Sequence, residues 1–129
     1  MFSLIMALNL ITDSLIEGSN LELSPGDQLI DLSHVDDVVK HFLEAEEYLS
    51  NLSEPSWQVF FVNGERLTVK ELVINLEKIV GRKFRGSFGN RPYRDREIMN
   101  PVLSSKELPW EKKVHKISLK EGLSILMEG

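Results

Sequence analysis

The sequence contains no cysteine, and its first 56 positions hold a single basic residue, Lys40. The absence of cysteine excludes a disulfide framework, a thiolate nucleophile and a cysteine-ligated zinc site. Three scattered histidines do not replace such a site, so we expect no bound metal. A chain without disulfides also fits the reducing cytosol, and we therefore expect a cytoplasmic protein.

Long hydrophobic runs are also lacking. The apolar start, residues 1–8, has no basic residue and runs into Asn9, Thr12 and Asp13, so it has neither the pattern of a signal peptide nor the length of a membrane span. We interpret it as part of a helix that packs on the rest of the chain. With 129 residues and 42% hydrophobic content, the sequence predicts one soluble domain over residues 1–129, with a modest core and no membrane partner.

Charge is divided unevenly along the chain. Up to Ser56 there are eleven acidic residues and one basic residue, a formal charge of −10, whereas the remainder has fourteen basic and nine acidic residues, a charge of +5. Such a division indicates either two surfaces that meet each other or a basic site for an anionic ligand. We favour the ligand, and since the chain as a whole is acidic we expect no nucleic-acid partner.

Hydrophobic spacing predicts four helices. The first ends near Gly18, the second starts near His34 with Ser33 as N-cap and ends before Pro55, and the third follows a capping box of Thr68 and Glu71. The fourth follows Ser118. The inward stripes expected of these helices are, in order, Leu4, Leu8, Ile11 and Leu15; Val35, Val38, Val39, Phe42, Leu43 and Leu49; Val69, Leu72, Val73, Leu76, Ile79 and Val80; and Leu119, Leu123, Leu126 and Met127.

Short strands are predicted between the helices. Pro25-Gly26 has turn chemistry, so Leu23 and residues 29–32 are expected to form a hairpin. The aromatic and β-branched run 57–62 predicts a strand that should be covered. A further short strand and a loop are expected after Gly81, and one helical turn over residues 104–108.

The motifs of unaided catalysis are absent. The sequence has no Gly-x-Gly-x-x-Gly cofactor loop, no Gly-x-Ser-x-Gly elbow, no phosphate loop and no Tyr-x-x-x-Lys pair. His34 lies beside Asp36 and Asp37, but acidic residues in a first helical turn are an ordinary start signal. We assign both aspartates to capping and fold support, and we predict no catalytic, cofactor-binding or metal-binding residue.

Residues 82–97 carry six basic residues, together with aromatic, glycine and proline residues. Arginine presents a planar fork of donors that matches phosphate, and glycine lets the backbone approach a ligand closely. Two alternatives remain open. The segment could be a solvated basic strand and loop that pairs with the acidic half of the chain, or, as a third choice, it could bind nucleic acid.

Several motifs carry a resemblance to a known family. Residues 24–28 (Ser-Pro-Gly-Asp-Gln), Asp31 and residues 34–39 (His-Val-Asp-Asp-Val-Val) resemble a stretch of the extended short-chain dehydrogenase/reductases that act on nucleotide sugars, the NAD-dependent epimerase/dehydratase family. That stretch reads Gly-x-Gln-x-Arg-Asp-(aromatic)-x-(His/Tyr)-Val-Asp-Asp and introduces a helix. Residues 59–64 fall where the family has its last sheet strand. Residues 91–99 resemble the family's segment that reaches the substrate diphosphate, in a form closest to that of nucleotide-sugar 4-keto-6-deoxyhexose reductases.

The resemblance implies a small mixed α/β substrate-binding portion of an extended Rossmann-type enzyme, with about four helices and three to four short strands. It covers only the carboxyl-terminal part of the family's pattern, without the Rossmann half that holds NAD or NADP. It also implies a nucleotide-diphosphate sugar as ligand, with Arg94, then Arg91, at the diphosphate and Gln28 as a polar neighbour. Ile30 stands where the family often has a phosphate-binding arginine, and Leu103 replaces an aspartate.

Two functions therefore remain for this chain. The first is the substrate-binding part of a sugar epimerase, dehydratase or reductase whose catalysis needs another polypeptide, so whether the chain is itself an enzyme stays open. The second is a non-catalytic oligomerisation or interaction module that has lost its ligand. Because strand 57–62 would leave an unpaired apolar edge, we expect a homo-oligomer or a separate Rossmann-containing chain as partner.

Overall fold

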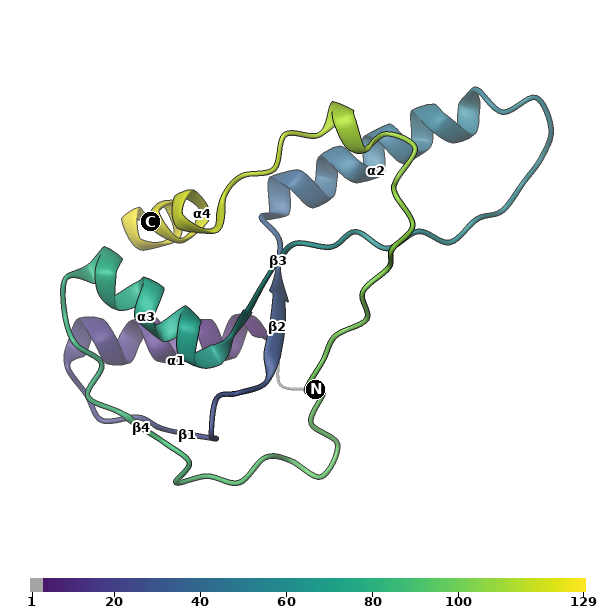
Figure 1. Cartoon of the computed structure of the whole chain (residues 1–129). Coiled ribbons are helices and arrows are strands. Elements are labelled where there is room, and N and C mark those ends of the chain that lie inside the picture. Colours follow the sequence, from purple (N-terminus) through teal and green to yellow (C-terminus); the bar gives the residue numbers. More distant parts are fainter. Residues whose placement is uncertain (1–3) are drawn as a thin grey trace.

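A computed structural model describes residues 4–129, so the first three residues of the expected amino-terminal helix lie outside the described part. The chain forms a mixed α/β structure with four α-helices and four short strands, as expected (Figure 1). In order these are α1 (Leu4–Glu17), β1 (Glu22–Leu23), β2 (Leu29–Leu32), α2 (Val35–Ser50), β3 (Glu65–Thr68), α3 (Val69–Val80), β4 (Ser87–Phe88), the 3₁₀ turn η1 (Glu111–Lys113) and α4 (Leu119–Glu128). None of the helices in this described part is long and apolar enough to cross a membrane.

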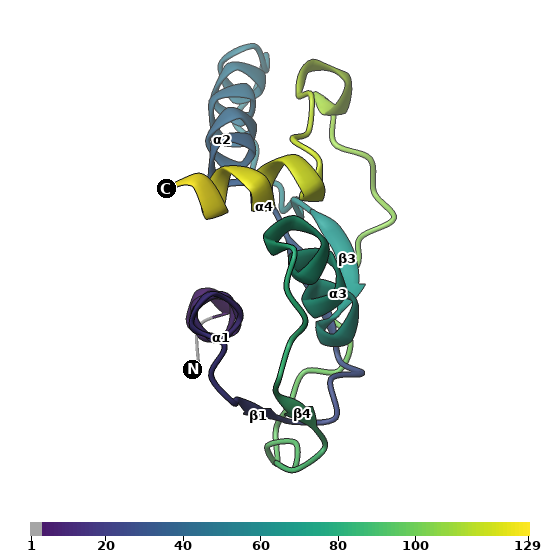
Figure 2. The ribbon, with the colours of Figure 1, turned by 90° about the vertical axis from the view of Figure 1, so that its left-hand side faces the viewer.

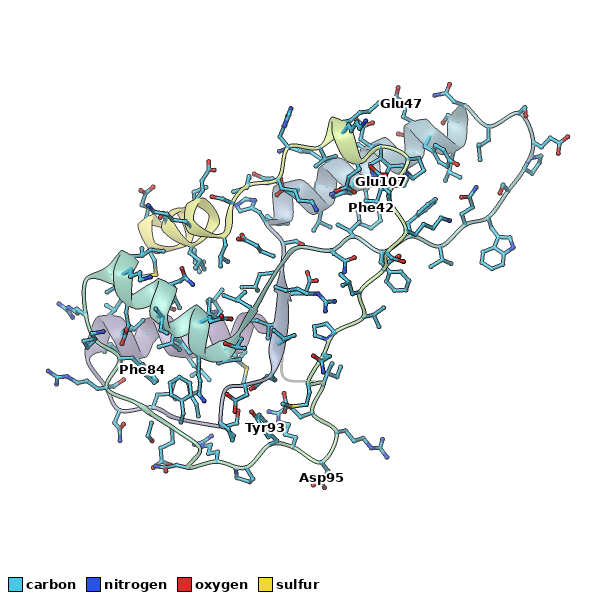
Figure 3. The ribbon with its side chains drawn as sticks, in the orientation of Figure 1. Phe42, Glu47, Phe84, Tyr93, Asp95 and Glu107 are labelled. Carbon is cyan, nitrogen blue, oxygen red and sulfur yellow. The ribbon has the colours of Figure 1, made fainter. Side chains whose placement is uncertain are left out.

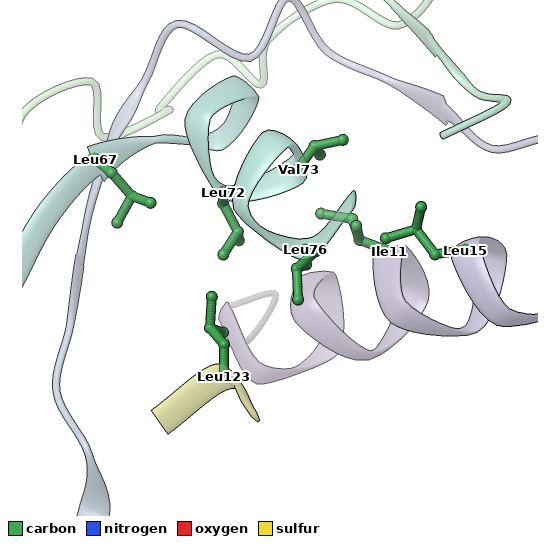
Figure 4. Close-up of a cluster of buried hydrophobic side chains, with 7 residues drawn as sticks. All are labelled: Ile11, Leu15, Leu67, Leu72, Val73, Leu76 and Leu123. Atoms are coloured by element: carbon green, nitrogen blue, oxygen red, sulfur yellow. The ribbon is translucent and has the colours of Figure 1, made fainter. Parts of the chain in front are cut away.

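The main hydrophobic core lies between α1, α3, α4 and the β2–β3 pair (Figure 4). The predicted stripes of α1 and α3 supply most of it, because residues three and four apart share one helical face. Leu123 is the buried residue of α4, whereas Leu126 is 44% exposed and does not face inward as predicted. The seven buried residues of this core are Ile11, Leu15, Leu67, Leu72, Val73, Leu76 and Leu123.

Strand pairing differs from the predicted hairpin. β1 pairs in parallel with β4, and β2 pairs antiparallel with β3, with Ile30 opposite Leu67. The turn between β1 and β2 is instead held by α3, since the Lys70 amide donates to the Gly26 carbonyl over 3.1 Å. The short strand predicted after Gly81 is present as β4, and it adds to β1 from a distant part of the sequence.

Helix α2 projects from the core as an arm, and the chain returns along it through residues 51–64 (Figures 1 and 2). A second, smaller cluster fixes the arm: Leu108, Trp110 and Val114 are buried against Ala45, Tyr48 and Phe60. The face of α2 turned to this cluster carries Asp37 and His41, both buried. The predicted inward stripe of α2 is therefore wrong, because Val35, Val39, Phe42, Leu43 and Leu49 are each more than half exposed.

Residues 57–62 do not form the predicted strand, and Trp57 is 84% exposed. A strand needs a partner for its backbone groups, and no strand in residues 4–129 runs beside this segment. The strand that pairs with β2 begins three residues further on, at Glu65. Glycine at position 64 permits the pairing that begins at Glu65, because any other residue would place a Cβ only 2.0 Å from the Leu32 carbonyl oxygen, which is a clash.

The helix ends follow local rules with two departures. The Thr68–Glu71 capping box is confirmed, and Gly81 closes α3 with a positive φ of 74°. His34, rather than Ser33, caps α2, because its Nδ1 accepts the Asp36 amide at 3.2 Å. Residues 104–108 are not helical; the turn forms at η1 instead, after Pro109-Trp110. A side-chain hydrogen bond explains part of the missing helical turn, because the Lys106 amide donates to Ser104 Oγ and this local bond competes with helical hydrogen bonding.

Candidate functional site

The turn of residues 25–28 is held from two sides. On one side, the Val69 amide donates to the Gln28 carbonyl and Lys70 Nζ lies 2.7 Å from Asp27 Oδ1. On the other side the Phe88 ring covers Gly26, which is buried with φ +81°. A Cβ on Gly26 would lie 2.8 Å from that ring, so the close approach requires glycine. The turn is therefore a fixed support.

The loop of residues 89–99 is attached along its length to this turn and to Leu23 and Leu29, which flank it. The amides of Gly89 and Arg91 both donate to the Leu23 carbonyl, at 3.0 and 3.3 Å. Further on, the Asp27 amide donates to the Tyr93 hydroxyl at 2.9 Å, and the Leu29 amide donates to the Met99 carbonyl at 2.8 Å. We name the turn 25–28 and the loop 89–99 together the arginine wall.

The three residues predicted to bind ligand all lie on the arginine wall. Arg91 and Arg94 are exposed, and a turn in which the Glu97 amide donates to the Arg94 carbonyl follows them. Gln28 is half-buried; its Nε2 donates to Ser24 Oγ, and its Oε1 is buried with no hydrogen-bond partner in the described chain. The structure thus brings together two segments that lie more than sixty residues apart in the sequence.

Tyr93 is the residue of this wall that the sequence prediction passed over. Its hydroxyl joins the two segments, with the donor and acceptor 66 positions apart in the chain. Figure 3 shows Tyr93 and Asp95 in the loop that runs below β2. The sequence indicates this role only through the residue type, because a tyrosine among arginines can pack its ring and still form a hydrogen bond through its hydroxyl.

Four basic residues of segment 82–97 lie in two places: Arg91 and Arg94 in the arginine wall, and Arg82 and Lys83 at helix ends. Arg82 and Lys83 lie at the ends of α1 and α3, where the Arg82 guanidinium donates to the Ile16 carbonyl and Lys83 pairs with Glu77. Basic side chains near the carboxyl end of a helix complement its dipole, which is a structural role. Ion pairs between the acidic and basic halves of the chain also exist, and Arg66, Lys70 and Lys113 take part in them.

A polar cluster lies under the base of the arm, where α2 meets residues 108–117. Trp110 Nε1 donates to His41 Nδ1 at 3.1 Å, so the neutral imidazole carries its proton on Nε2. The Asp37 carboxylate, 4% exposed, accepts the Ile117 amide at 2.7 Å. Asp37 thus supports the fold as expected, but it does so through a hydrogen bond to a residue 80 positions away in the sequence. Both side chains line a cavity of about 180 Å³.

Stability should decrease in mild acid because of His41. Burial lowers the pKa of His41; nearby Lys116 lowers it further, while Glu111 and Asp37 oppose the shift. Below about pH 6.5 the unfolded chain binds a proton at His41, whereas the folded chain resists protonation until the lowered pKa is reached. The contribution of neutral His41 to the free energy of unfolding is therefore complete above that pH. It is lost as the pH falls towards the lowered pKa, at up to about 1.4 kcal/mol per pH unit. Urea unfolding across this range should show a shallower loss for His41→Gln. An equal slope in both proteins would contradict the assignment.

No group of histidine, aspartate and glutamate side chains in residues 4–129 is arranged to hold a metal ion. In the polar cluster under the arm, the His41 imidazole accepts from the Trp110 indole and the Asp37 carboxylate accepts from the Ile117 amide, while His41 Nε2 is buried without a hydrogen-bond partner in the described residues. The arginine wall presents the exposed guanidinium groups of Arg91 and Arg94, so the arrangement can bind an anion and orient it.

Comparison with protein-family models and with curated protein sequences gives no match. Solved structures do match. A UDP-glucose 4-epimerase of Thermotoga maritima with UDP-glucose is similar over 95% of this chain and 38% of its own, at 23% identity and a TM-score of 0.72. MoeE5 in complex with UDP-glucose and NAD is similar over 96% of this chain and 40% of its own, at 20% identity and a TM-score of 0.70.

A third structure extends the comparison. The UDP-glucose 4-epimerase of Thermus thermophilus in complex with NAD is similar over 98% of this chain and 40% of its own, at 18% identity and a TM-score of 0.63. The chain thus spans about two fifths of the length of the structures it matches. At these identities the similarity is one of fold. Over most of its length, the structure is similar to part of the fold of UDP-glucose 4-epimerases, which are NAD-dependent epimerases.

Proposed function

We propose that the arginine wall binds the diphosphate of a nucleotide sugar, and that the chain acts as the substrate-binding part of an NAD(P)-dependent sugar epimerase, dehydratase or reductase. The observation that carries the proposal is the attachment of loop 89–99, which holds Arg91 and Arg94, to the turn 25–28, which holds Gln28, and to the flanking residues Leu23 and Leu29. Pre-ordered donors bind an anion with less loss of conformational entropy than a mobile loop does.

Each residue has a distinct part in this proposal. Arg94 makes the principal contact, because a guanidinium can donate two parallel hydrogen bonds to phosphate oxygens, and Arg91 adds a second positive charge. Gln28 Oε1 is a buried acceptor with no partner in the described chain, and a ligand hydroxyl or N–H that reached it would satisfy it. The fold similarity to two structures that hold UDP-glucose supports the ligand class.

The sugar can be narrowed on sequence grounds alone. The form of residues 92–99, Pro-Tyr-Arg-x-x-Glu-Ile-Met, is closest to that of enzymes acting on 4-keto-6-deoxy sugars. We therefore place such a sugar first among the candidate ligands. Catalysis in this proposal comes from another polypeptide that supplies the cofactor-binding half, since the sequence carries no glycine-rich loop and no Tyr-x-x-x-Lys pair.

Replacement of Arg94 should weaken nucleotide-sugar binding by roughly ten- to a hundredfold, since a hydrogen bond to a charged group contributes about 1.5–3 kcal/mol. Isothermal titration of the chain with UDP-glucose, other nucleotide sugars and UDP measures this for Arg94→Ala. Arg96→Ala is the matched control, because it removes the same charge from an exposed position of the same loop. Equal loss in both variants would indicate general attraction by charge, and no binding at millimolar ligand would refute the proposal.

A second function, an interaction module without a ligand, is favoured by one observation. Helix α2, which forms the arm, and residues 57–62, which return along it, expose large apolar side chains. Such surfaces on soluble chains mark contacts with other macromolecules. The two functions are compatible, because the arginine wall and the arm lie at different ends of the molecule (Figure 1).

A further inference from the structure

The sequence contains a single Asn-Gly pair, Asn63 and Gly64. Asparagine is chemically labile, and before glycine it is most easily attacked, because glycine has no Cβ to hinder the approach of its backbone nitrogen to the side-chain carbonyl carbon. The new C–N bond closes a succinimide ring, and the side-chain nitrogen leaves as ammonia. Water then opens the ring to aspartate or isoaspartate. The net change consumes one water, releases one ammonia and turns an amide into a carboxylate, without oxidation or reduction.

The pair lies immediately before β3, where the segment that returns along α2 rejoins the sheet (Figure 1). Both of its reacting groups are bound to one carboxylate, that of Asp31 in β2. The Gly64 amide donates to Asp31 Oδ1, and Asn63 Nδ2 donates to Asp31 Oδ2 at 3.4 Å. Asn63 Nδ2 also donates to the Val102 carbonyl at 3.2 Å, and Arg66 Nε lies 3.3 Å from Asp31 Oδ2. We name Asp31, Asn63 and Gly64 together the amide joint.

We propose that Asn63 is a site of spontaneous deamidation that Asp31 suppresses in the folded chain, so that conversion occurs when the amide joint opens. The hydrogen bonds of the joint oppose both steps of the attack. The Gly64 nitrogen must lose its proton, and a carboxylate that accepts this N–H stabilises the protonated amide. The Asn63 carboxamide must turn its carbon towards that nitrogen, which breaks the bonds from Nδ2 to Asp31 and Val102. This inference is independent of ligand binding at the arginine wall.

Conversion damages the joint that prevents it. An aspartate at position 63 places a second carboxylate beside that of Asp31 and beside the Val102 carbonyl, so that acceptors face one another where an N–H group joined them. The two negative charges repel. Arg66 cannot turn to the new charge without loss, because its Nη2 already donates to the Pro101 and Val102 carbonyls. Isoaspartate also lengthens the backbone by one methylene group, which displaces β3 relative to β2. Deamidation therefore loosens the base of the arm.

Incubation of the whole chain at neutral pH, followed by tryptic digestion and mass spectrometry, tests the proposal. The tryptic peptide 41–66 contains Asn51 and Asn63, so fragment ions assign the replacement of NH2 by OH to one of the two. Conversion at Asn63 should be at least about tenfold slower in the folded wild-type chain than in the same chain in concentrated urea. Asp31→Ala should raise the rate in the folded chain by roughly ten- to a hundredfold, because hydrogen bonds to a charged group are lost. Asp31→Asn, which keeps one acceptor oxygen, should give an intermediate rate.

Val73→Ala is the matched control, because it weakens the hydrophobic core and leaves the residues of the amide joint unchanged. Under conditions in which circular dichroism shows both variants folded, it should raise the rate much less than Asp31→Ala does. The predicted damage is measured separately. Asn63→Asp carries the side chain of the product, and it should unfold at a lower urea concentration than Asn63→Ala, which removes the same hydrogen bonds without adding a charge.

Four results would overturn the proposal: equal conversion in the folded chain and in urea, a rate in both Asp31 variants at or below that of the wild type, equal acceleration by Val73→Ala, or an Asn63→Asp chain as stable as Asn63→Ala. A lower rate in the Asp31 variants would mean that this carboxylate promotes the attack instead of suppressing it. Because the comparison with urea uses the wild-type chain alone, a variant that failed to fold would not prevent the decision.

Discussion

Leu76→Ala is expected to destabilise the folded chain by about 2–5 kcal/mol, which is a large part of the roughly 5–15 kcal/mol of a typical domain. Leu76 is 0% exposed and belongs to the core shared by α1, α3 and α4 (Figure 4). Its truncation removes buried methyl groups and leaves a cavity that three packed helices cannot readily close. Urea unfolding followed by circular dichroism measures the change.

Ile74→Ala provides the comparison for this prediction. Ile74 lies on the same helix, α3, and its side chain is an isomer of that of Leu76, but it is 47% exposed. Both variants place alanine in the interior of one helix, so propensity changes nearly cancel between them. We expect a loss below about 1 kcal/mol for Ile74→Ala. Similar losses in the two variants would mean that the core does not lie where the structure places it.

Asp37→Ala is expected to cost about 2–3 kcal/mol and to loosen the connection between η1 and α4. The Asp37 carboxylate is buried, accepts the Ile117 amide at 2.7 Å and lies 3.5 Å from Lys40 Nζ. Its removal leaves the Ile117 amide without an acceptor in a half-buried position. Hydrogen exchange should therefore increase at Ile117 and its neighbours, in addition to the loss of stability.

Two variants separate this contact from general effects of charge. Asp36→Ala removes the neighbouring carboxylate, whose side chain is 67% exposed, and should cost under about 1 kcal/mol. Asp37→Asn keeps an oxygen that can accept the amide, so it should restore part of the protection at Ile117. If Asp36→Ala and Asp37→Ala had equal effects, the contact with Ile117 would not be the cause.

Helices whose pattern and caps agree could be predicted well from the sequence. α3 has apolar residues at helical spacing, a Thr68–Glu71 capping box and Gly81 at its end, and all three signals apply within a few residues. The existence of α2 was equally clear, but its orientation was not. Its most apolar stripe is exposed, and its buried face carries Asp37 and His41, whose partners Ile117 and Trp110 are distant in sequence.

Strands were predicted less well because a strand depends on its partner. The run 57–62 has the composition of a strand, yet no strand of the described chain lies beside it, whereas Glu65–Thr68 has an ordinary composition and pairs with β2. The candidate site shows the same limit. The basic segment 82–97 stood out by residue type, and the resemblance of residues 91–99 to a known family singled out Arg91 and Arg94, but the bond from the Asp27 amide to Tyr93 that fixes their loop depends on the fold.

The most direct test of the central claim is a titration of the ¹⁵N-labelled chain with a nucleotide-diphosphate sugar, followed by amide chemical shifts. Binding at the arginine wall should move the signals of Gln28 and of residues 91–97 together, with a single affinity. Those of Arg82 and Lys83, which are equally basic but lie at helix ends, should not move. Shifts confined to Arg82 and Lys83, or no shifts at millimolar ligand, would contradict the account.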